Sequence, residues 1–196
     1  MEADTAVLVP VKAFGEAKRR LSPALTPSDR VALSRRLAAG VVAAAAPLPV
    51  AVVCDDREVA GWARALGALV IWEPGQGLNG AVAAGVARLA AEGVATVVVA
   101  HGDLARPAGL TGLLIGHPWS GVTLVPDGRD DGTNVIVLPS RAAFDFSYGP
   151  GSFRRHLDEV AARSRSGRVV RGSDLSLDVD LPSDLPLAGC AARAAW

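Results

Sequence analysis

Three aspartates in this chain stand where carboxylates could hold a metal ion. Asp103 follows Val94–Ala100, the most apolar run of the sequence, while Asp178 and Asp180 alternate with apolar residues in the segment LDVDL at 177–181. Side chains two positions apart in an extended segment point to the same side, so we expect Asp178 and Asp180 to face the same way. Adjacent carboxylates repel unless a cation lies between them, and Mg²⁺ takes oxygen ligands of this kind. The pattern suits a three-carboxylate metal site, and it also suits an exposed strand with two solvated acids.

Four cations follow the first apolar run. Thr5–Val11 is short, apolar and mostly β-branched, which predicts a buried strand. The loop after it carries Lys12, Lys18, Arg19 and Arg20. Ligands of open α/β sheets bind beyond the carboxyl ends of the strands, so this loop favours a polyanion, most simply a nucleoside triphosphate. The other interpretation is a solvated basic loop.

Residues 75–80, GQGLNG, formally match the dinucleotide fingerprint G-x-G-x-x-G, with Asp103 further along the chain. This match raises the alternative hypothesis of dinucleotide binding. Glu73 and Pro74 separate the preceding strand from the glycines, however, and two earlier strand–helix units stay unexplained. The glycines would still allow a ligand to approach the backbone closely. Asn79 adds an amide that could hydrogen-bond a base or a ribose.

Two further loops of small residues are DGTN at 131–134 and GPGS at 149–152. The second opens a predicted helix, whose N-terminal amides favour an anion. Ser152 could cap this helix or hold a phosphate or carboxylate. His156, one turn further, is expected at the surface. The sequence contains no zinc-type histidine spacing, Walker P-loop, G-x-S-x-G elbow or paired cysteine site.

The elements that must position these residues alternate between strand and helix. Such alternation predicts a single α/β domain over residues 1–196, with a mostly parallel sheet and helices on both faces. The strand at 94–100 is expected at the centre of the sheet. Strands are predicted at 5–11, 49–54, 68–72, 94–100, 121–125, 134–138, 168–171 and 176–179, and helices from 26, at 58–66, 78–91, 107–115 and 152–163, and from 182.

Composition disfavours several classes of protein. At 196 residues the chain can bury a core, and Lys+Arg and Asp+Glu balance at 20 each, which argues against nucleic acid as a partner. Leu37–Cys54 is uncharged, but Pro47 and Pro49 interrupt it, so we expect a helix end and a buried strand rather than a membrane span. Cys54, expected in the core, and Cys190 match no redox or metal spacing, and residues 1–4 resemble no signal peptide. We therefore expect a reduced, cytoplasmic location.

Taken in order, these motifs resemble one enzyme family. It comprises the phosphoenolpyruvate or 2-phospho-L-lactate guanylyltransferases of coenzyme F-420 (deazaflavin) biosynthesis. The resemblance runs from about Val7 to Leu185. That family is similar in fold to the molybdenum-cofactor guanylyltransferases, which implies a Rossmann-like nucleotidyltransferase fold. The motifs that carry the resemblance are VPVK…AKRRLSP, GLNGAV, HGDL, DGTN, YGPGSFRRH and LDVDLPSDL.

The resemblance also implies a role for particular residues, matched position by position. The implied Mg²⁺ ligands are Asp103, Asp178 and Asp180. The positions implied to hold the phosphorylated three-carbon acid are Thr133, Gly149 and Ser152. The implied catalytic cations near the triphosphate are Lys12, Lys18 and Arg20, and the implied nucleotide-binding residues are Pro10, Asn79 and Gly80.

The implied reaction joins GTP to phosphoenolpyruvate or 2-phospho-L-lactate and releases pyrophosphate, with hand-over of the product to the next transferase. Two departures stand out. Ala105 and Arg106 displace the proline that usually follows Asp-Leu, and Asp130-Asp131-Gly132 is more acidic than the usual turn. Extra negative charge beside an anionic substrate leaves the acceptor open. The alternatives are a nucleotidyltransferase for 3-phosphoglycerate, a molybdopterin or a sugar phosphate, and a non-catalytic nucleotide-binding module.

Overall fold

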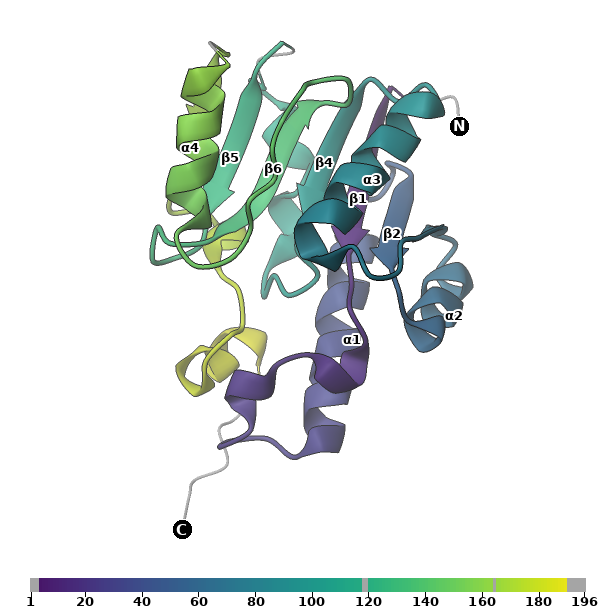
Figure 1. Cartoon of the computed structure of the whole chain (residues 1–196). Coiled ribbons are helices and arrows are strands. Elements are labelled where there is room, and N and C mark those ends of the chain that lie inside the picture. The colour runs from purple at the N-terminus through teal and green to yellow at the C-terminus, as the bar shows by residue number, and fades with distance from the viewer. Residues whose placement is uncertain (1–3, 118–119, 164, 190–196) are drawn as a thin grey trace.

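A seven-stranded sheet forms the middle of the molecule, with strand order β3-β2-β1-β4-β6-β5-β7 (Figure 1). The structure is a computed structural model that describes residues 4–117, 120–163 and 165–189, so Cys190 lies outside the described residues. The strands are β1 (Thr5–Pro10), β2 (Val50–Cys54), β3 (Leu69–Trp72), β4 (Thr96–Ala100), β5 (Val122–Pro126), β6 (Thr133–Pro139) and β7 (Gly167–Val169).

Most of the strand pairs are parallel. β1 pairs in parallel with β2 and β4, as do β2 with β3 and β5 with β7. Among the strands of the described residues, β6 runs antiparallel to both of its neighbours, β4 and β5. β4 is the middle strand and all of its residues are buried, as its continuous apolar sequence predicts. The prediction of a mostly parallel α/β sheet is therefore confirmed.

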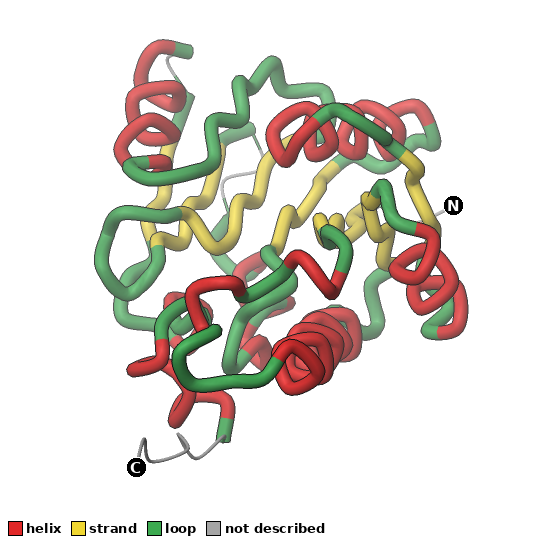
Figure 2. The backbone as a smooth tube through the Cα atoms, turned by 60° about the horizontal axis from the view of Figure 1, so that its bottom comes forward, coloured by secondary structure: helices red, strands yellow, loops and turns green. Residues whose placement is uncertain are grey.

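Helices cover both faces of the sheet, as Figure 2 shows in the rows of red on either side of the yellow strands. On β1, Val7 and Val9 pack in one core cluster with residues of α1 and α2, while Ala6 and Leu8 pack in another with residues of α3 and α4. This alternation follows from the two-residue period of a strand. The helices are α1 (Pro27–Ala44), α2 (Arg57–Ala65), α3 (Gly77–Ala91) and α4 (Ser152–Ala162).

The uncharged stretch from Leu37 to Cys54 divides as predicted. α1 begins after Thr26, whose hydroxyl accepts a hydrogen bond from the Asp29 amide at 3.2 Å, and it ends at Ala44 before the prolines. The rest of the stretch becomes β2, in which Cys54 is buried. Among the described residues, no helix is both long and apolar enough to cross a membrane.

Two predicted elements are wrong. Residues 176–179 do not form a strand: a 3-10 helix at Asp174–Ser176 precedes them, and Asp178 makes only one isolated bridge, to Leu104. The segment pairs with the irregular chain after β4 rather than with a full strand. Residues 107–115 form two short 3-10 helices, Pro107–Gly109 and Thr111–Leu114, because glycine inside this stretch disfavours a continuous α-helix. The last predicted helix is the 3-10 helix Pro182–Ala188.

The packing of α3 on β1 gives a stability prediction. A Cβ added to Gly85 of α3 would lie 2.7 Å from Cδ2 and 2.9 Å from Cδ1 of the buried Leu8. We expect Gly85→Ala to lower the free energy of unfolding by about 1–3 kcal/mol, measured by urea denaturation, because overpacking forces the core apart.

Gly61 of α2 is the matched control, because a Cβ there would meet nothing within 4 Å. Gly61→Ala should raise the free energy of unfolding by about 0.5–1 kcal/mol through the unfolded state. Equal effects of the two substitutions would contradict the close contact between α3 and β1.

Candidate active site

Two cavities meet beyond the carboxyl ends of β1, β2 and β4. The first has a volume of about 500 Å³ and the second of about 420 Å³. His101, Asp103 and Asp180 line both cavities and therefore form their common wall. This edge of the sheet is where ligands bind in open α/β folds.

The antiparallel direction of β6 explains why the second cavity lies here. The end of β4 pairs with the start of β6, Ala100 opposite Val135. The first residues of β6, Thr133 and Asn134, therefore reach the same edge of the sheet as the last residues of β4. Both line the second cavity, together with the start of α4.

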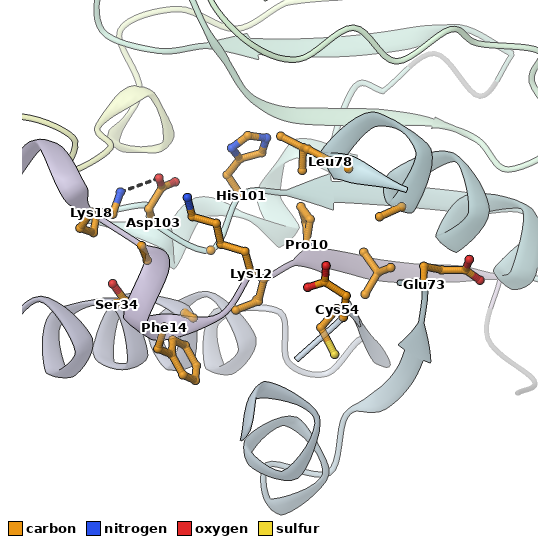
Figure 3. Close-up of a pocket in the computed structure, with 18 of the residues that line it drawn as sticks. Pro10, Lys12, Phe14, Lys18, Ser34, Cys54, Glu73, Leu78, His101 and Asp103 are labelled. Atoms are coloured by element: carbon orange, nitrogen blue, oxygen red, sulfur yellow. Dashed lines mark hydrogen bonds and ion pairs between the residues drawn. The ribbon is translucent and has the colours of Figure 1, made fainter. Parts of the chain in front are cut away.

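The first cavity is lined by residues from the β1 loop, the end of β2 and the start of α3 (Figure 3). Pro10, Lys12 and Lys18 are among them, and Figure 3 shows the Lys12 side chain extending toward Asp103. Asn79 and Gly80 do not line it. The Asn79 Oδ1 atom instead accepts a hydrogen bond from the Tyr148 amide at 2.7 Å, which ties the start of α3 to the loop before α4.

Lys18 connects two of the predicted metal ligands. Its Nζ atom lies 2.7 Å from Asp103 Oδ2 and 3.2 Å from Asp180 Oδ1, and its side chain is only 7% exposed. Arg20 also reaches Asp180, at 3.5 Å, and lines the second cavity. Arg19 pairs instead with Glu16 on the surface, so the interpretation of a solvated basic loop holds for Arg19.

The charges around Lys18 shift the pKa values of these groups. Burial by itself lowers the pKa of the Lys18 ammonium, but Asp103 and Asp180 outweigh it and the pKa is raised. Burial by itself raises the pKa of Asp103, and the positive charge of Lys18 outweighs it, so this pKa is lowered. For Asp178, burial and the neighbouring Asp103 charge raise the pKa to about 6.

Asp103, Asp178 and Asp180 all line the second cavity, so the structure brings the three predicted ligands together. Asp103 Oδ1 is buried without a hydrogen-bond partner among the described residues. In this arrangement, with Lys18 between two of the acids, no group of three His, Cys, Asp or Glu side chains in the described chain is set to hold a metal ion.

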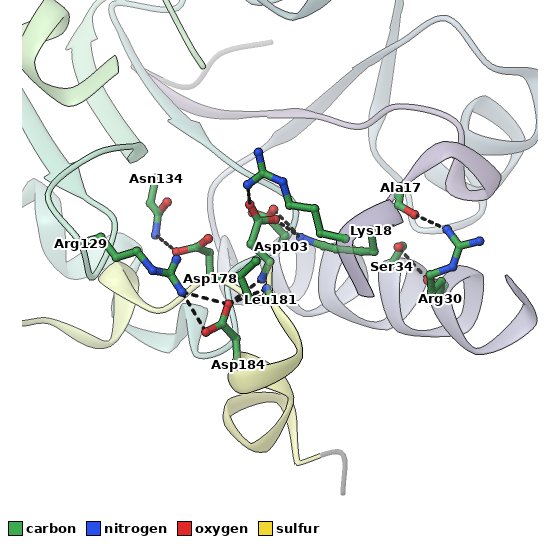
Figure 4. A network of polar contacts seen from close by, with 12 residues as sticks. Ala17, Lys18, Arg30, Ser34, Asp103, Arg129, Asn134, Asp178, Leu181 and Asp184 are labelled. Atoms are coloured by element: carbon green, nitrogen blue, oxygen red, sulfur yellow. Dashed lines mark hydrogen bonds and ion pairs between the residues drawn. The ribbon is translucent and has the colours of Figure 1, made fainter. Parts of the chain in front are cut away.

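The support for these carboxylates comes from residues to which the sequence analysis gave no role (Figure 4). The Asn134 amide donates to Asp178 Oδ1 at 3.4 Å and to the Leu175 carbonyl at 3.0 Å. The backbone amide of Asp180 donates to Asp184 Oδ2 at 3.0 Å, and Asp184 pairs with Arg129 at 3.1 Å. The repeated acid in LDVDLPSDL is the one sequence signal for Asp184, since it recurs within the same motif.

The second cavity contains the predicted acceptor-binding positions Thr133, Gly149 and Ser152. Gly151, with φ of 72°, is the residue before the first turn of α4, and no side chain caps the helix. The interpretation of Ser152 as a cap is therefore wrong. Ser152 is 1% exposed, and the helix start faces the cavity without a capping oxygen from it.

His156 was expected at the surface, and this expectation is wrong. The side chain is fully buried below the second cavity, because α4 turns this face toward the sheet. Its Nε2 atom accepts a hydrogen bond from the Ser147 amide at 3.0 Å, and its Nδ1 atom lies 2.9 Å from Thr133 Oγ1. An amide N–H can only donate, so Nε2 carries no proton and the neutral ring carries its proton on Nδ1.

The acidic turn before β6 is partly neutralised. Asp130 pairs with Arg171 at 2.9 Å, whereas the Asp131 carboxylate lines the second cavity and accepts a hydrogen bond from the Gly151 amide at 3.0 Å. Asp127 holds the turn by accepting from backbone amides within it. Asp131 therefore places negative charge at the start of α4, where an anionic ligand would also bind.

Comparison with known proteins relates this chain to guanylyltransferases. The family model described as guanylyl transferase CofC like matches residues 5–187. The phosphoenolpyruvate guanylyltransferase of Sphaerobacter thermophilus is 34% identical over 194 residues, covering 95% of this chain and 94% of that protein. The 2-phospho-L-lactate guanylyltransferase of Methanothermobacter thermautotrophicus is 34% identical over 187 residues, covering 92% of this chain and 82% of that protein.

A solved structure supports the fold. A nucleotidyl transferase from the same organism superimposes with a TM-score of 0.65 at 18% identity, covering 93% of this chain and 94% of that one. The Rossmann-like nucleotidyltransferase fold is thereby confirmed. The dinucleotide-binding hypothesis finds no support, since its glycines follow the edge strand β3 and the relatives transfer nucleotides.

The buried His156 gives a prediction for the pH dependence of stability. Burial lowers the pKa of His156 to about 4, with the positive charge of Arg155 acting in the same direction. Between pH 6.5 and 4 the unfolded chain binds the proton and the folded chain does not, so stability should fall as the pH falls. The loss should reach about 3 kcal/mol below pH 4, measured by urea denaturation across this range.

His156→Gln is the matched variant, because a glutamine can accept from Ser147 and donate to Thr133 without titrating. The wild type should lose about 3 kcal/mol more than this variant between pH 6.5 and 4. Identical pH profiles would show that His156 is not buried in its neutral form.

Proposed function

The chain belongs to the guanylyl transferase CofC-like family, and from this premise we propose that it transfers GMP from GTP to phosphoenolpyruvate or 2-phospho-L-lactate and releases pyrophosphate. The observation that carries the proposal is the pair of cavities that share Asp103 and Asp180 as a wall. A transfer between two anions needs two adjoining sites with cationic groups at their junction. Lys18 and Arg20 provide charge there.

GTP is assigned to the first cavity. Its volume of about 500 Å³ lies in the usual range for small-molecule sites. Lys12 and Lys18 supply positive charge for the triphosphate, and the start of α3 at Gly77 and Leu78 supplies backbone near the other end. Pro10 contributes apolar surface. Asn79 and Gly80, which do not line the cavity, are assigned to shaping the start of α3.

The phosphorylated acid is assigned to the second cavity. The hydroxyl groups of Thr133 and Ser152 and the positive end of the α4 dipole favour a phosphate or a carboxylate. The first amides of α4 already donate to Asp131 and Gly149. Arg20 and Arg129 also line this cavity and add positive charge. Gly149 lets the acid approach the backbone without a side chain in the way.

The donor set fits Mg²⁺. Asp103 Oδ1 is a buried oxygen without a hydrogen-bond partner among the described residues, and three carboxylates line one cavity. Hard divalent cations take such oxygen ligands, so Asp103, Asp178 and Asp180 would hold the ion. When bound, Mg²⁺ would neutralise phosphate charge and align the triphosphate.

The chain's own residues then account for the transfer. An acceptor phosphate oxygen attacks the α-phosphorus of GTP in line, the new O–P bond forms, and the bond to the leaving pyrophosphate breaks. Lys12 and Lys18 balance the charge of the triphosphate and Arg20 that of the acceptor, which reduces the repulsion between the two anions. No covalent enzyme intermediate is required.

A role in coenzyme F-420 biosynthesis, hand-over to the next transferase, a cytoplasmic location and kinship with the molybdenum-cofactor guanylyltransferases stay predictions. The activity itself is tested by pyrophosphate release with Mg²⁺. We expect release with GTP and either phosphoenolpyruvate or 2-phospho-L-lactate, and none with ATP, CTP or 3-phosphoglycerate. Asp180→Asn should lower kcat by about 100-fold or more, since it removes a metal ligand, without changing the far-ultraviolet circular dichroism.

Asp174→Asn is the control, because Asp174 lies in the same C-terminal segment but pairs with Arg106 at the surface. It should keep wild-type activity. An unstable product can hide turnover, so the assay is repeated with the next pathway transferase present. If no acid then causes pyrophosphate release, the result would favour a different acceptor or a nucleotide-binding role. Near-normal activity after Asp178→Asn and Asp180→Asn together would exclude the metal assignment.

Asp131 gives a separate prediction about the acceptor. Its carboxylate shares the start of α4 with the expected acid. Asp131→Asn keeps a side-chain oxygen that can accept the hydrogen bond from the Gly151 amide, but it removes the negative charge. The KM for the acid should fall by about three- to tenfold with little change in kcat, since one like charge near a solvated anion costs on the order of 1 kcal/mol.

Asp130→Asn is the control, because Asp130 already pairs with Arg171. Its KM for the acid should stay at the wild-type value. A rise in KM for Asp131→Asn would mean that Asp131 supports acceptor binding rather than opposing it.

A further inference from the structure

We propose that Lys18 is an internal counter-ion for the metal site: it occupies the space between Asp103 and Asp180 until a triphosphate draws it away and a divalent cation takes its place. This inference rests on the proposed function, because it concerns the same three carboxylates. It adds that metal binding and nucleotide binding are coupled through one side chain.

The geometry carries the first step. Lys18 Nζ contacts Asp103 Oδ2 at 2.7 Å and Asp180 Oδ1 at 3.2 Å, so one ammonium joins two acids that are far apart in the sequence. The Lys18 side chain is 7% exposed, while that of Asp180 is 39% exposed. Figure 4 shows Lys18 reaching across from the β1 loop to Asp103. An ammonium held this way blocks a divalent cation by both volume and charge.

The backbone at Lys18 supports the same conclusion. Lys18 has φ of 56°, in the left-handed region that residues with a side chain rarely adopt. It lies between two short 3-10 helices, Phe14–Glu16 and Arg19–Leu21. A strained residue persists where surrounding contacts hold it, and the contacts here include the two ion pairs of the side chain and a hydrogen bond from the Leu21 amide to the Lys18 carbonyl at 3.0 Å. Losing the ion pairs would remove the side-chain part of that support.

The charge balance at these carboxylates favours replacement of the Lys18 ammonium by a divalent cation over binding of the cation beside it. The Lys18 ammonium faces Asp103 and Asp180, Arg20 makes a longer pair with Asp180 at 3.5 Å, and Asp178 accepts a hydrogen bond from the neutral amide of Asn134. The three acids together thus carry more negative charge than Lys18 and Arg20 balance. A divalent cation in its place would balance more, provided that Lys18 finds another anion.

The triphosphate that we place in the first cavity would be that anion. Lys18 lines it beside Lys12, at the end where Figure 3 shows both lysines near Asp103. A triphosphate bound there would compete with the carboxylates for the Lys18 ammonium. The coupling is reciprocal by thermodynamic necessity: the nucleotide promotes metal binding and the metal promotes nucleotide binding.

The test measures Mn²⁺ binding by electron paramagnetic resonance, without any turnover. In the absence of nucleotide, wild type should bind Mn²⁺ weakly, and Lys18→Met should bind it at least tenfold more tightly. Lys18→Arg keeps the counter-ion and should bind as weakly as wild type. Arg19→Met is the matched control, because Arg19 lies in the same loop but pairs with Glu16 at the surface, and it should also bind like wild type.

Lys18→Gln serves as a second variant if Lys18→Met unfolds, with folding checked by circular dichroism. Equal or weaker Mn²⁺ binding by folded Lys18→Met or Lys18→Gln would overturn the counter-ion inference while leaving the proposed function in place. A wild-type protein that binds no Mn²⁺ even with the α,β-methylene analogue of GTP would overturn the metal site itself.

Discussion

Negative charge gathered at one edge of the sheet is the constraint on which the rest of this structure depends. Asp103, Asp178 and Asp180 line one cavity, and the ligands expected beside them are also anions. Like charges that line one partly buried cavity repel each other strongly unless cations lie between them. Neighbouring residues reduce this cost: Lys18 and Arg20 approach from the β1 loop, and Asn134 donates to Asp178. A fourth acid, Asp184, pairs with Arg129.

The antiparallel direction of β6 places a second cavity beside the first one. In a wholly parallel sheet, the strand beside β4 would also end at this edge, with its start at the opposite edge. Because β6 runs antiparallel, it begins here, and Thr133 and Asn134 lie beyond the end of β4. The chain then returns through the loop before α4, so that the start of this helix closes the second cavity. The second cavity thus follows from the direction of β6, beside a first cavity that the parallel strands β1 and β2 provide.

The fold was predictable from sequence because apolar runs mark buried strands directly, and the centre of the sheet follows from the most apolar of them, residues 94–100. The three acids were singled out for a similar reason, although the strand predicted at 176–179 is the end of a 3-10 helix followed by irregular chain with a single bridge. The pairing of Lys18 was not predictable, since its partners are 85 and 162 residues away. His156 was missed because its helix is rich in charge, and only the tertiary contact with Thr133 shows that it is buried.

The hydrogen bonds of His156 decide which kind of hydrogen-bond partner the second cavity presents at Thr133. The Ser147 amide fixes the proton on Nδ1, so the ring donates to Thr133 Oγ1. The threonine hydroxyl has thus used a lone pair toward the core, and its own hydrogen is left for the cavity that it lines. A ligand oxygen at this point must accept. An ionised phosphate or carboxylate meets that requirement in every orientation, whereas a hydroxyl group must first turn its own hydrogen away.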